Sequence, residues 1–293
     1  MGRLIRCITT DGCVTAMAVD TTDIVNEAAR LHETSAVISA ALGRLLTAAS
    51  MMGSSLKTDV GSITLRLSAD GPAGSVVAVA DSDGNVRGYA ENPVVEIPLN
   101  PKGKLDVGGA VGHNGSLYVL KDLGMKEPYN GVIPLVSGEI AEDITAYFAE
   151  SEQIPTVCAL GVLVNPDLTI KAAGGYLIQL LPTADNEIIT KVEKSIETIQ
   201  PITTLLSNGM SLEDIVKNAL NQFEVEKLDE GVVEYKCNCS RERTEKVLST
   251  IGADDLNKLA EEQEVTSVNC HFCNRVYDFT SEELKTLSKK ISK

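Results

Sequence analysis

The chain opens with segments in which apolar and polar residues alternate with a period of two, a pattern typical of strands with one buried face. Between residues 4 and 19 the alternation is interrupted by Asp11-Gly12, a turn signal that predicts a hairpin. A second hairpin closes the region, with Gly174-Gly175 as a predicted bulge. The segments that share this alternation are predicted to form antiparallel sheet: Leu4–Thr9, Val14–Val19, short strands within Ser62–Ser137, Thr156–Val164 and Leu168–Leu181.

Three segments follow a helical period instead and are predicted to pack on the sheet: residues 24–31, 34–52 and 139–150. The second is rich in Ala and Leu, which indicates a helix buried against a sheet. Its most apolar stretch, Val37 to Met52, contains Arg44 and is too short to span a bilayer, so no membrane partner is predicted. Together these elements predict an N-terminal α+β domain over residues 1–182.

Residues 183–230 carry apolar stripes at helical spacing and are predicted to form an amphipathic helical linker. Ser211 is a predicted helix cap before the last stripe. Apolar stripes need a surface to cover them, and the adjacent domains offer one. From this stripe four residues are predicted to bind partner proteins: Ile215, Val216, Leu220 and Phe223.

The tail, residues 231–293, contains four cysteines in two close pairs, in Cys237-Asn238-Cys239 and in Cys270-His271-Phe272-Cys273. Two close thiol pairs separated by about thirty residues are the ligand set of a tetrahedral structural zinc site. We therefore predict a small C-terminal zinc-binding domain with one Zn²⁺ per chain. His271 lies inside the second pair and is expected to face solvent.

Two interpretations of this site remain open. In the first, the zinc site is purely structural and only stabilises the tail. The other is a redox switch, because the thiolate is both the metal ligand and the form that reacts with oxidants. Oxidation would be expected to join the neighbours Cys237–Cys239 and Cys270–Cys273, and such small loops restrain an unfolded chain little. Because the tail has few large apolar residues, losing the metal should unfold it.

Composition narrows the function further. The net charge is −15 and nearly all of it lies before residue 231, which argues against a nucleic-acid partner. The chain has seven cysteines and starts with a strand-like run rather than a signal peptide, so a reducing, cytoplasmic location is predicted. Cys7, Cys13 and Cys158 are scattered singly and are expected to be small apolar residues.

Two alternative functions of other classes are disfavoured. A zinc-ribbon module that binds nucleic acid would use the same cysteine spacing, but the near-neutral tail and acidic body disfavour it. A zinc enzyme is also disfavoured, because four thiolates leave no coordination position for a catalytic water. No Gly-x-Ser-x-Gly or His-Glu-x-x-His motif is present, so the chain is predicted not to be an enzyme.

The order of acidic α+β body, helical linker and paired-cysteine tail resembles the redox-regulated holdase chaperones of the heat-shock protein thirty-three family, the 33 kDa chaperonins. The resemblance covers nearly the whole chain. Three segments carry it: Cys237-Asn238-Cys239-Ser240, Cys270-His271-Phe272-Cys273-Asn274, and the apolar residues 161–166 through 174–179.

The resemblance implies a chaperone that is inactive when reduced and zinc-bound, and that is activated by peroxide or hypochlorous acid together with unfolding stress. By that likeness Cys237, Cys239, Cys270 and Cys273 are both the zinc ligands and the disulfide-forming switch. The tail and linker would unfold, and the active form, expected to be a homodimer, would hold unfolding clients without ATP. Clients would then pass to ATP-dependent refolding chaperones.

Overall fold

The computed structural model describes residues 1–58 and 60–291, which form two compact units, Met1–Lys236 and Cys237–Lys293. The first unit contains two five-stranded sheets, and every pairing within them is antiparallel. The first sheet has the order β10-β1-β2-β9-β8. Its strands are β1 (Gly2–Thr9), β2 (Val14–Asp20), β8 (Thr156–Val164), β9 (Ile170–Leu180) and β10 (Val225–Val233).

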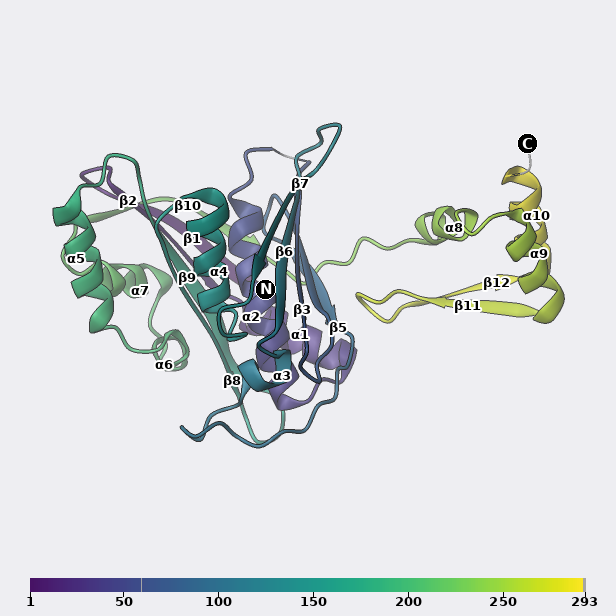
Figure 1. Ribbon diagram of the computed structural model, residues 1–293, viewed down its shortest axis with the longest axis horizontal. Helices are drawn as coiled ribbons and strands as arrows, with labels where there is room; N and C mark the ends of the chain where they lie inside the picture. Colours follow the sequence, from purple (N-terminus) through teal and green to yellow (C-terminus); the bar gives the residue numbers. More distant parts are fainter. Residues whose placement is uncertain (59, 292–293) are drawn as a thin grey trace. The chain divides into compact units, whose positions relative to one another are not determined.

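The second sheet has the order β5-β4-β3-β6-β7 (Figure 1). Its strands are β3 (Ser62–Ala69), β4 (Val76–Asp81), β5 (Val86–Ala90), β6 (Gly115–Asp122) and β7 (Tyr129–Pro134). The alternation of apolar and polar residues that predicted these strands corresponds to their alternating burial, as in β3, where Ile63, Leu65 and Leu67 are buried. The expected α+β class with antiparallel sheets is therefore confirmed.

Helix α2 (Ala36–Ser54) lies between the two sheets and packs against strands of both. All of its residues except Ala36 and Arg44 are buried, which explains its small, apolar composition. The helix is longer than the apolar stretch Val37–Met52, so its length and composition would suit a membrane span, but 89% of its apolar stretch is buried inside the protein, as in a core helix. Gly53 permits close approach, because a Cβ there would lie 2.6 Å from the Asp81 carbonyl oxygen.

The other helices of this body are α1 (Thr22–His32), α3 (Val107–Val111) and α4 (Ala141–Tyr147), which continues into a π-helical turn, η1 (Phe148–Glu152). The helix predicted over residues 139–150 is thus split. The turn places Glu152 where it accepts hydrogen bonds from the buried Tyr147 hydroxyl and from the Lys121 ammonium, each at 2.5 Å. This polar group gives a reason for the π-helical irregularity that the sequence pattern did not show.

The predicted bulge at Gly174-Gly175 is wrong. The register of β8 and β9 shifts at Leu163/Val164 instead. The two glycines are needed for close packing, because a Cβ on Gly174 would lie 2.5 Å from the Val19 carbonyl oxygen and one on Gly175 would lie 2.7 Å from that of Ala159.

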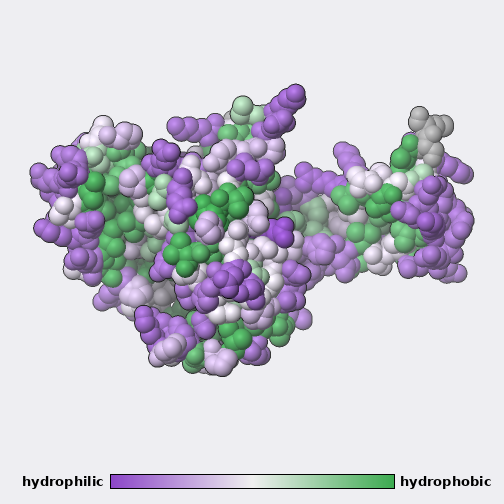
Figure 2. All heavy atoms as spheres, in the orientation of Figure 1, coloured by the Kyte–Doolittle hydropathy of each residue, from purple (hydrophilic) through white to green (hydrophobic). Residues whose placement is uncertain are grey.

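The linker segment forms three helices that pack on the face of the first sheet opposite α2. They are α5 (Asn186–Glu197), α6 (Ile202–Ser207) and α7 (Leu212–Ala219). Ser211 caps α7 by accepting a hydrogen bond from the Asp214 amide, as predicted. Figure 2 shows apolar side chains on the visible surface beside α5. By its contacts this segment belongs to the first unit, and the division at residues 182 and 230 stays a prediction about which segments unfold together.

The pattern did not predict strand β10, which occupies the end of the expected helical linker. After it, residues 234–236 run beside β5, where the Val86 amide donates to the Glu234 carbonyl at 2.9 Å and the Lys236 amide donates to the Val86 carbonyl at 2.8 Å. Val233 itself is fully buried. The chain is therefore attached to both sheets of the first unit up to the residue before Cys237.

The second unit contains a two-stranded antiparallel sheet and three helices. Its elements are α8 (Arg241–Ser249), α9 (Ala253–Glu262), β11 (Val265–Asn269), β12 (Val276–Thr280) and α10 (Ser281–Ile291). A capping box opens α10, since the Thr280 amide donates to the Glu283 carboxylate and the Glu283 amide donates to the Thr280 hydroxyl. The buried apolar cluster is small: Leu248, Leu256, Ala260, Phe279 and Leu284.

Candidate metal centre

The first cysteine pair lies in the segment that leads into α8, and the start of this helix fixes its shape. Ser240 caps α8 by accepting a hydrogen bond from the Arg243 amide at 3.2 Å. The Arg243 guanidinium turns back and donates to the Asn238 carbonyl at 3.0 Å. Asn238 is the residue between Cys237 and Cys239, so these two bonds hold the Cys-x-Cys segment against the helix N-terminus.

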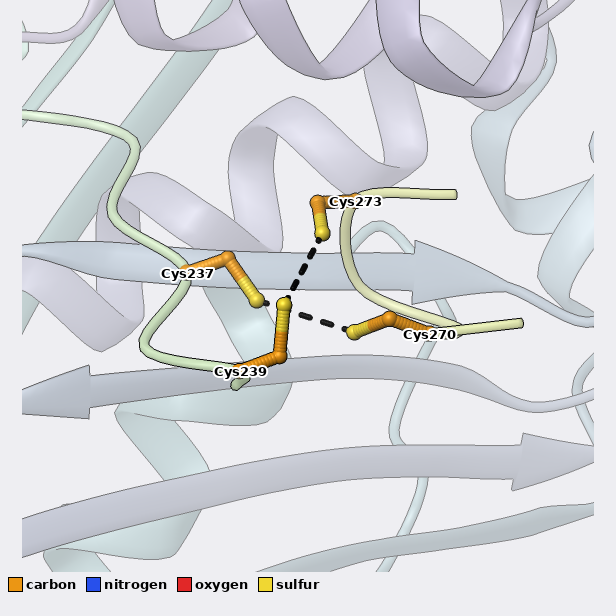
Figure 3. Close-up of side chains that lie close together, drawn as sticks. All are labelled: Cys237, Cys239, Cys270 and Cys273. Carbon is orange, nitrogen blue, oxygen red and sulfur yellow. Dashed lines mark hydrogen bonds between the residues drawn. The ribbon is translucent and has the colours of Figure 1, made fainter. Parts of the chain in front are cut away.

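The second pair lies in the tight turn that joins β11 to β12. The Cys270 amide donates to the Arg275 carbonyl at 2.9 Å, and the Asn274 amide donates to the Cys270 carbonyl at 2.8 Å. Asn274 takes the left-handed conformation with φ 55°, which Asn tolerates better than most residues. The turn directs both sulfurs of the Cys-x-x-Cys segment to the same side, toward the first pair (Figure 3).

All four Sγ atoms lie within 4.8 Å of one another. The Cys237 and Cys270 sulfurs are 3.7 Å apart, and those of Cys239 and Cys273 are 3.4 Å apart. Four sulfurs bound to one zinc at about 2.3 Å would be about 3.8 Å apart at the corners of a tetrahedron. The donor set therefore fits a single tetrahedral metal ion. His271 is exposed and is not one of the four donors.

The environment of the sulfurs differs from one to the next. Burial raises the pKa of the Cys237 thiol, and it also raises that of Cys273. Burial likewise opposes ionisation of Cys239, but hydrogen bonds from the Tyr277 hydroxyl and the neighbouring thiols lower the pKa of Cys239 to about 7. The Tyr277 hydroxyl is 3.1 Å from this sulfur. Negative charge on the cluster is thus stabilised first at Cys239.

Tyr277 is the functional residue that the sequence analysis missed. It lies on β12 two residues before the buried Phe279, so both side chains are on the same face of the strand. The alternation of Tyr277 and Phe279 with polar or exposed neighbours in β12 therefore contains a signal for its position. It could not show that the hydroxyl reaches a cysteine sulfur, because the contact joins residues 38 positions apart.

The other predicted residues lie apart from the cysteine cluster. Ile215, Val216 and Leu220 are at most 1% exposed against the first sheet, and Phe223 is half-buried beside them. The predicted partner-binding stripe is therefore covered in this form of the protein.

The three remaining cysteines are also outside the cluster, and all seven thiols are free. Cys7 is buried within the first unit and Cys13 is half-buried. Cys158 packs against the main core, where burial raises the pKa of its thiol to about 12. A thiol with such a high pKa is protonated at neutral pH and reacts poorly with oxidants.

Comparison with known proteins identifies the family. The sequence profile of the family described as Hsp33 protein matches residues 2–280. The chain belongs to the Hsp33 family. Among curated relatives, the 33 kDa chaperonin of Lachnoclostridium phytofermentans is 47% identical over 284 residues, and that of Clostridium beijerinckii is 45% identical over 285 residues. Each alignment covers 97% of this chain and 97% of the relative.

The Hsp33 fold is also found by structural comparison. The crystal structure of the 33 kDa chaperonin (heat shock protein 33 homologue) from Thermotoga maritima matches with a TM-score of 0.90. The two sequences are 37% identical, and the match covers 99% of each chain. A chaperone function therefore follows from the family, and the cysteine cluster is a site that could hold a metal ion within it.

Proposed function

We propose that this Hsp33 protein is an ATP-independent holdase chaperone that oxidation switches on. One observation carries the proposal: four thiols are arranged for a single metal ion in a unit whose apolar core, over the described residues 237–291, has five buried residues. In this proposal the reduced, zinc-bound form is inactive. Loss of the metal then unfolds the unit, because its apolar core is too small to keep it folded.

The ligands in this proposal are Cys237, Cys239, Cys270 and Cys273, with one Zn²⁺ per chain. Four thiolate donors suit zinc, which when bound supplies a tetrahedral cross-link and no redox chemistry of its own. The link joins the start of α8 to the turn between β11 and β12, segments that are 31 residues apart from Cys239 to Cys270. The Tyr277 hydroxyl supports the site by stabilising charge on the Cys239 sulfur.

Oxidation replaces this long-range link by two short ones. For each bridge, two thiolates give two electrons to one hydrogen peroxide, which takes up two protons and leaves as two waters. The bridges we propose are Cys237–Cys239 and Cys270–Cys273, because in an unfolded tail the nearest thiol is two or three positions away. These small loops constrain the chain far less than the metal did.

Unfolding of the C-terminal unit removes the folded neighbour from the end of β10, because Cys237 directly follows Lys236. The helices of the linker would be released next. Their removal would uncover the apolar stripe of Ile215, Val216, Leu220 and Phe223, together with the sheet beneath it. We propose that this apolar surface binds unfolding client proteins and prevents their aggregation.

The compartment and the partners are also part of the proposed function. The free thiols require a reducing compartment, for which we propose the cytoplasm. The active form is expected to be a homodimer, and held clients would pass to ATP-dependent refolding chaperones when reducing conditions return. The net charge of −15 disfavours nucleic acid as a partner.

The test is client aggregation measured together with zinc release. The reduced protein is treated with peroxide at mildly elevated temperature, and light scattering of a thermally unfolding client is followed. We expect about one zinc released per chain and suppressed scattering, both reversed by reductant and zinc. A variant with Cys7, Cys13 and Cys158 changed to Ala should release zinc and suppress aggregation like the parent. Zinc release with unchanged client aggregation would leave only a structural clip, and salt-sensitive nucleic-acid binding by the reduced protein would favour the alternative class.

A further inference from the structure

Strand β10 forms the edge of the first sheet, but little holds it there apart from backbone hydrogen bonds to β1. Residues 226–232 are all exposed, including the apolar Leu228 at 59% and Val232 at 63%. Only its last residue, Val233, is buried. The pairing is also irregular, with a register shift between Arg6 and Cys7.

Two cavities adjoin β10, so part of the strand does not pack against other side chains. A cavity of about 760 Å³ is lined by Asp229–Val232 and by Glu234, together with residues of α2, β1 and the turn between β4 and β5. A second cavity, of about 340 Å³, reaches Leu228 and is lined in part by Met17 and Leu177.

The side chains of β10 are joined to the rest of the unit mainly by exposed ion pairs. Glu230 pairs with Arg3 at 2.6 Å, and Asp229 pairs with Arg6 at 3.0 Å. Lys227 contacts Glu213 of α7 at 3.3 Å. Exposed pairs of this kind contribute little to stability. Since β10 lies between α7 and Cys237 in the chain, loss of order on either side removes one of its supports.

Strand β1, which neighbours β10 in the sheet, is much better buried. In β1, Leu4, Ile5 and Cys7 are buried, and the strand stays paired with β2 on its other side. Removal of β10 would therefore leave a stable sheet with an open edge. Such an edge presents a row of unpaired backbone N–H and C=O groups, which pairs readily with another extended chain.

We propose that in the activated protein β10 leaves β1, and that an extended segment of an unfolding client takes its place as the edge strand of the first sheet. This inference rests on the proposed holdase function and specifies how the client is bound. Backbone pairing does not depend on sequence, so it suits a protein that must hold many different clients.

The residues that β10 now presents to the sheet define which segments fit best. Arg3 and Arg6 flank the edge and favour acidic residues at the positions of Asp229 and Glu230. The cavity of about 340 Å³ can take an apolar side chain at the position of Leu228. The preferred client segment is thus extended, with an apolar residue directly before an acidic pair, and strongly basic segments bind worst.

Hydrogen exchange on the full-length protein tests this directly. The β1 amides that pair with β10 should be protected in the reduced protein, exchange at least tenfold faster after oxidation, and become protected again when a client is bound. Protection that persists through oxidation would show that β10 never leaves. Protection that returns without client in proportion to protein concentration would assign the edge to a second copy of the chain. Either result overturns the inference.

A peptide with the sequence of residues 225–233 supplies the second test. It should displace a client from the oxidised protein. Two further peptides are N-methylated at every second residue, one at the residues whose N–H groups point toward β1 and one at the others. The first should not displace the client, and the second should displace it with an affinity within twofold of the unmodified peptide. Equal displacement by both methylated peptides would mean that side chains alone bind, and would refute strand addition. If the oxidised protein suppresses no aggregation at all, the proposed function itself fails.

A substitution within β10 can stabilise the pairing of this strand with β1. Gly231 lies within the strand, and a Cβ there meets no atom within 4 Å. Gly231→Val replaces a flexible residue by one that favours strands. We expect it to slow the exposure of β1 severalfold after oxidation, while the rate of zinc release stays that of the parent. An unchanged rate of β1 exposure would count against release of β10 as the controlling step.

Discussion

Replacement of one metal ligand tests the central physical claim. We predict that Cys270→Ser destabilises the C-terminal unit far more than its small change in volume would. A folded domain gains roughly 0.05–0.15 kcal/mol of stability per residue, so the 57 residues of Cys237–Lys293 correspond to about 3–9 kcal/mol. A structural zinc contributes about 10–16 kcal/mol in small domains of this kind. The metal therefore supplies more free energy than the net stability of the unit.

Shared equally among four sulfurs, that contribution is about 2.5–4 kcal/mol per thiolate. Loss of one thiolate should then lower the protection of core amides in this unit by roughly 10²–10³-fold, since about 1.4 kcal/mol is a factor of ten. The amides of β12 around Phe279 report on this core. Chelation of the metal from the parent should remove the protection entirely.

The assay is native-state hydrogen exchange of the full chain, with zinc content measured on the same sample. Cys13→Ser is the matched control, because Cys13 is half-buried in the first unit and lies outside the cluster. It should leave exchange in residues 237–291 unchanged. If chelation or Cys270→Ser lowers protection there by less than about tenfold, the apolar core rather than the metal holds the unit together, and the proposed route of activation fails.

Three further predictions address single side chains. Phe279→Ala empties the centre of the small apolar cluster, so it should cost the C-terminal unit about 3–5 kcal/mol of stability with all four cysteines intact, as seen by thermal unfolding followed by circular dichroism and by zinc retention. Tyr277→Phe removes the hydroxyl that donates to Cys239 and should weaken zinc affinity about 10–100-fold in a chelator titration. Glu152→Gln breaks the ion pair with Lys121, in which the Glu152 side chain is 22% exposed and the Lys121 side chain 19% exposed. This change should lower the stability of the first unit by roughly 1–3 kcal/mol in denaturant unfolding.

The last prediction has a defined pH dependence. Burial opposes the charge on Glu152, but hydrogen bonds from Lys121 and Tyr147 hold the pKa of Glu152 below its usual value. Its contribution to stability is therefore complete above the unfolded-state pKa of about 4.3 and is lost as the pH falls through the lower folded-state value. The difference between parent and Glu152→Gln should shrink in that acidic range. A difference that is constant down to pH 3, or a Tyr277→Phe protein with parental zinc affinity, would contradict the role assigned to that side chain.

Local patterns predicted most of the elements because each one depends on neighbours in the chain. The hairpin at Asp11-Gly12, the helix cap at Ser211 and the burial of helix α2 all follow from nearby residues. Spacing alone also predicted the cysteine cluster, since a metal site constrains the order of its ligands. The structure brings those four thiols together and shows that they fit one ion.

The features that were missed depend on distant partners. Strand β10 is predominantly polar and pairs with β1 more than two hundred residues away, so its periodicity contained no clear strand signal. The glycines at 174 and 175 were assigned to a bulge, although their role is to let β2, β8 and α6 approach. The hydroxyl of Tyr277 acts on a sulfur that only folding brings within reach.

The first sheet is apolar on both faces, and its two faces belong to separate clusters. One cluster surrounds α2 and includes Leu4 and Val19, whereas the other lies under α5–α7 and includes Ile5 and Ala18. Adjacent residues of the same strands thus serve different interiors. Detachment of helices α5–α7 would therefore expose the cluster beneath them to solvent, while the cluster around α2 stays buried and packed. The sheet would stay folded with one apolar face exposed to solvent. The protein could then return to its inactive state when helices α5–α7 pack on that face again, without complete refolding.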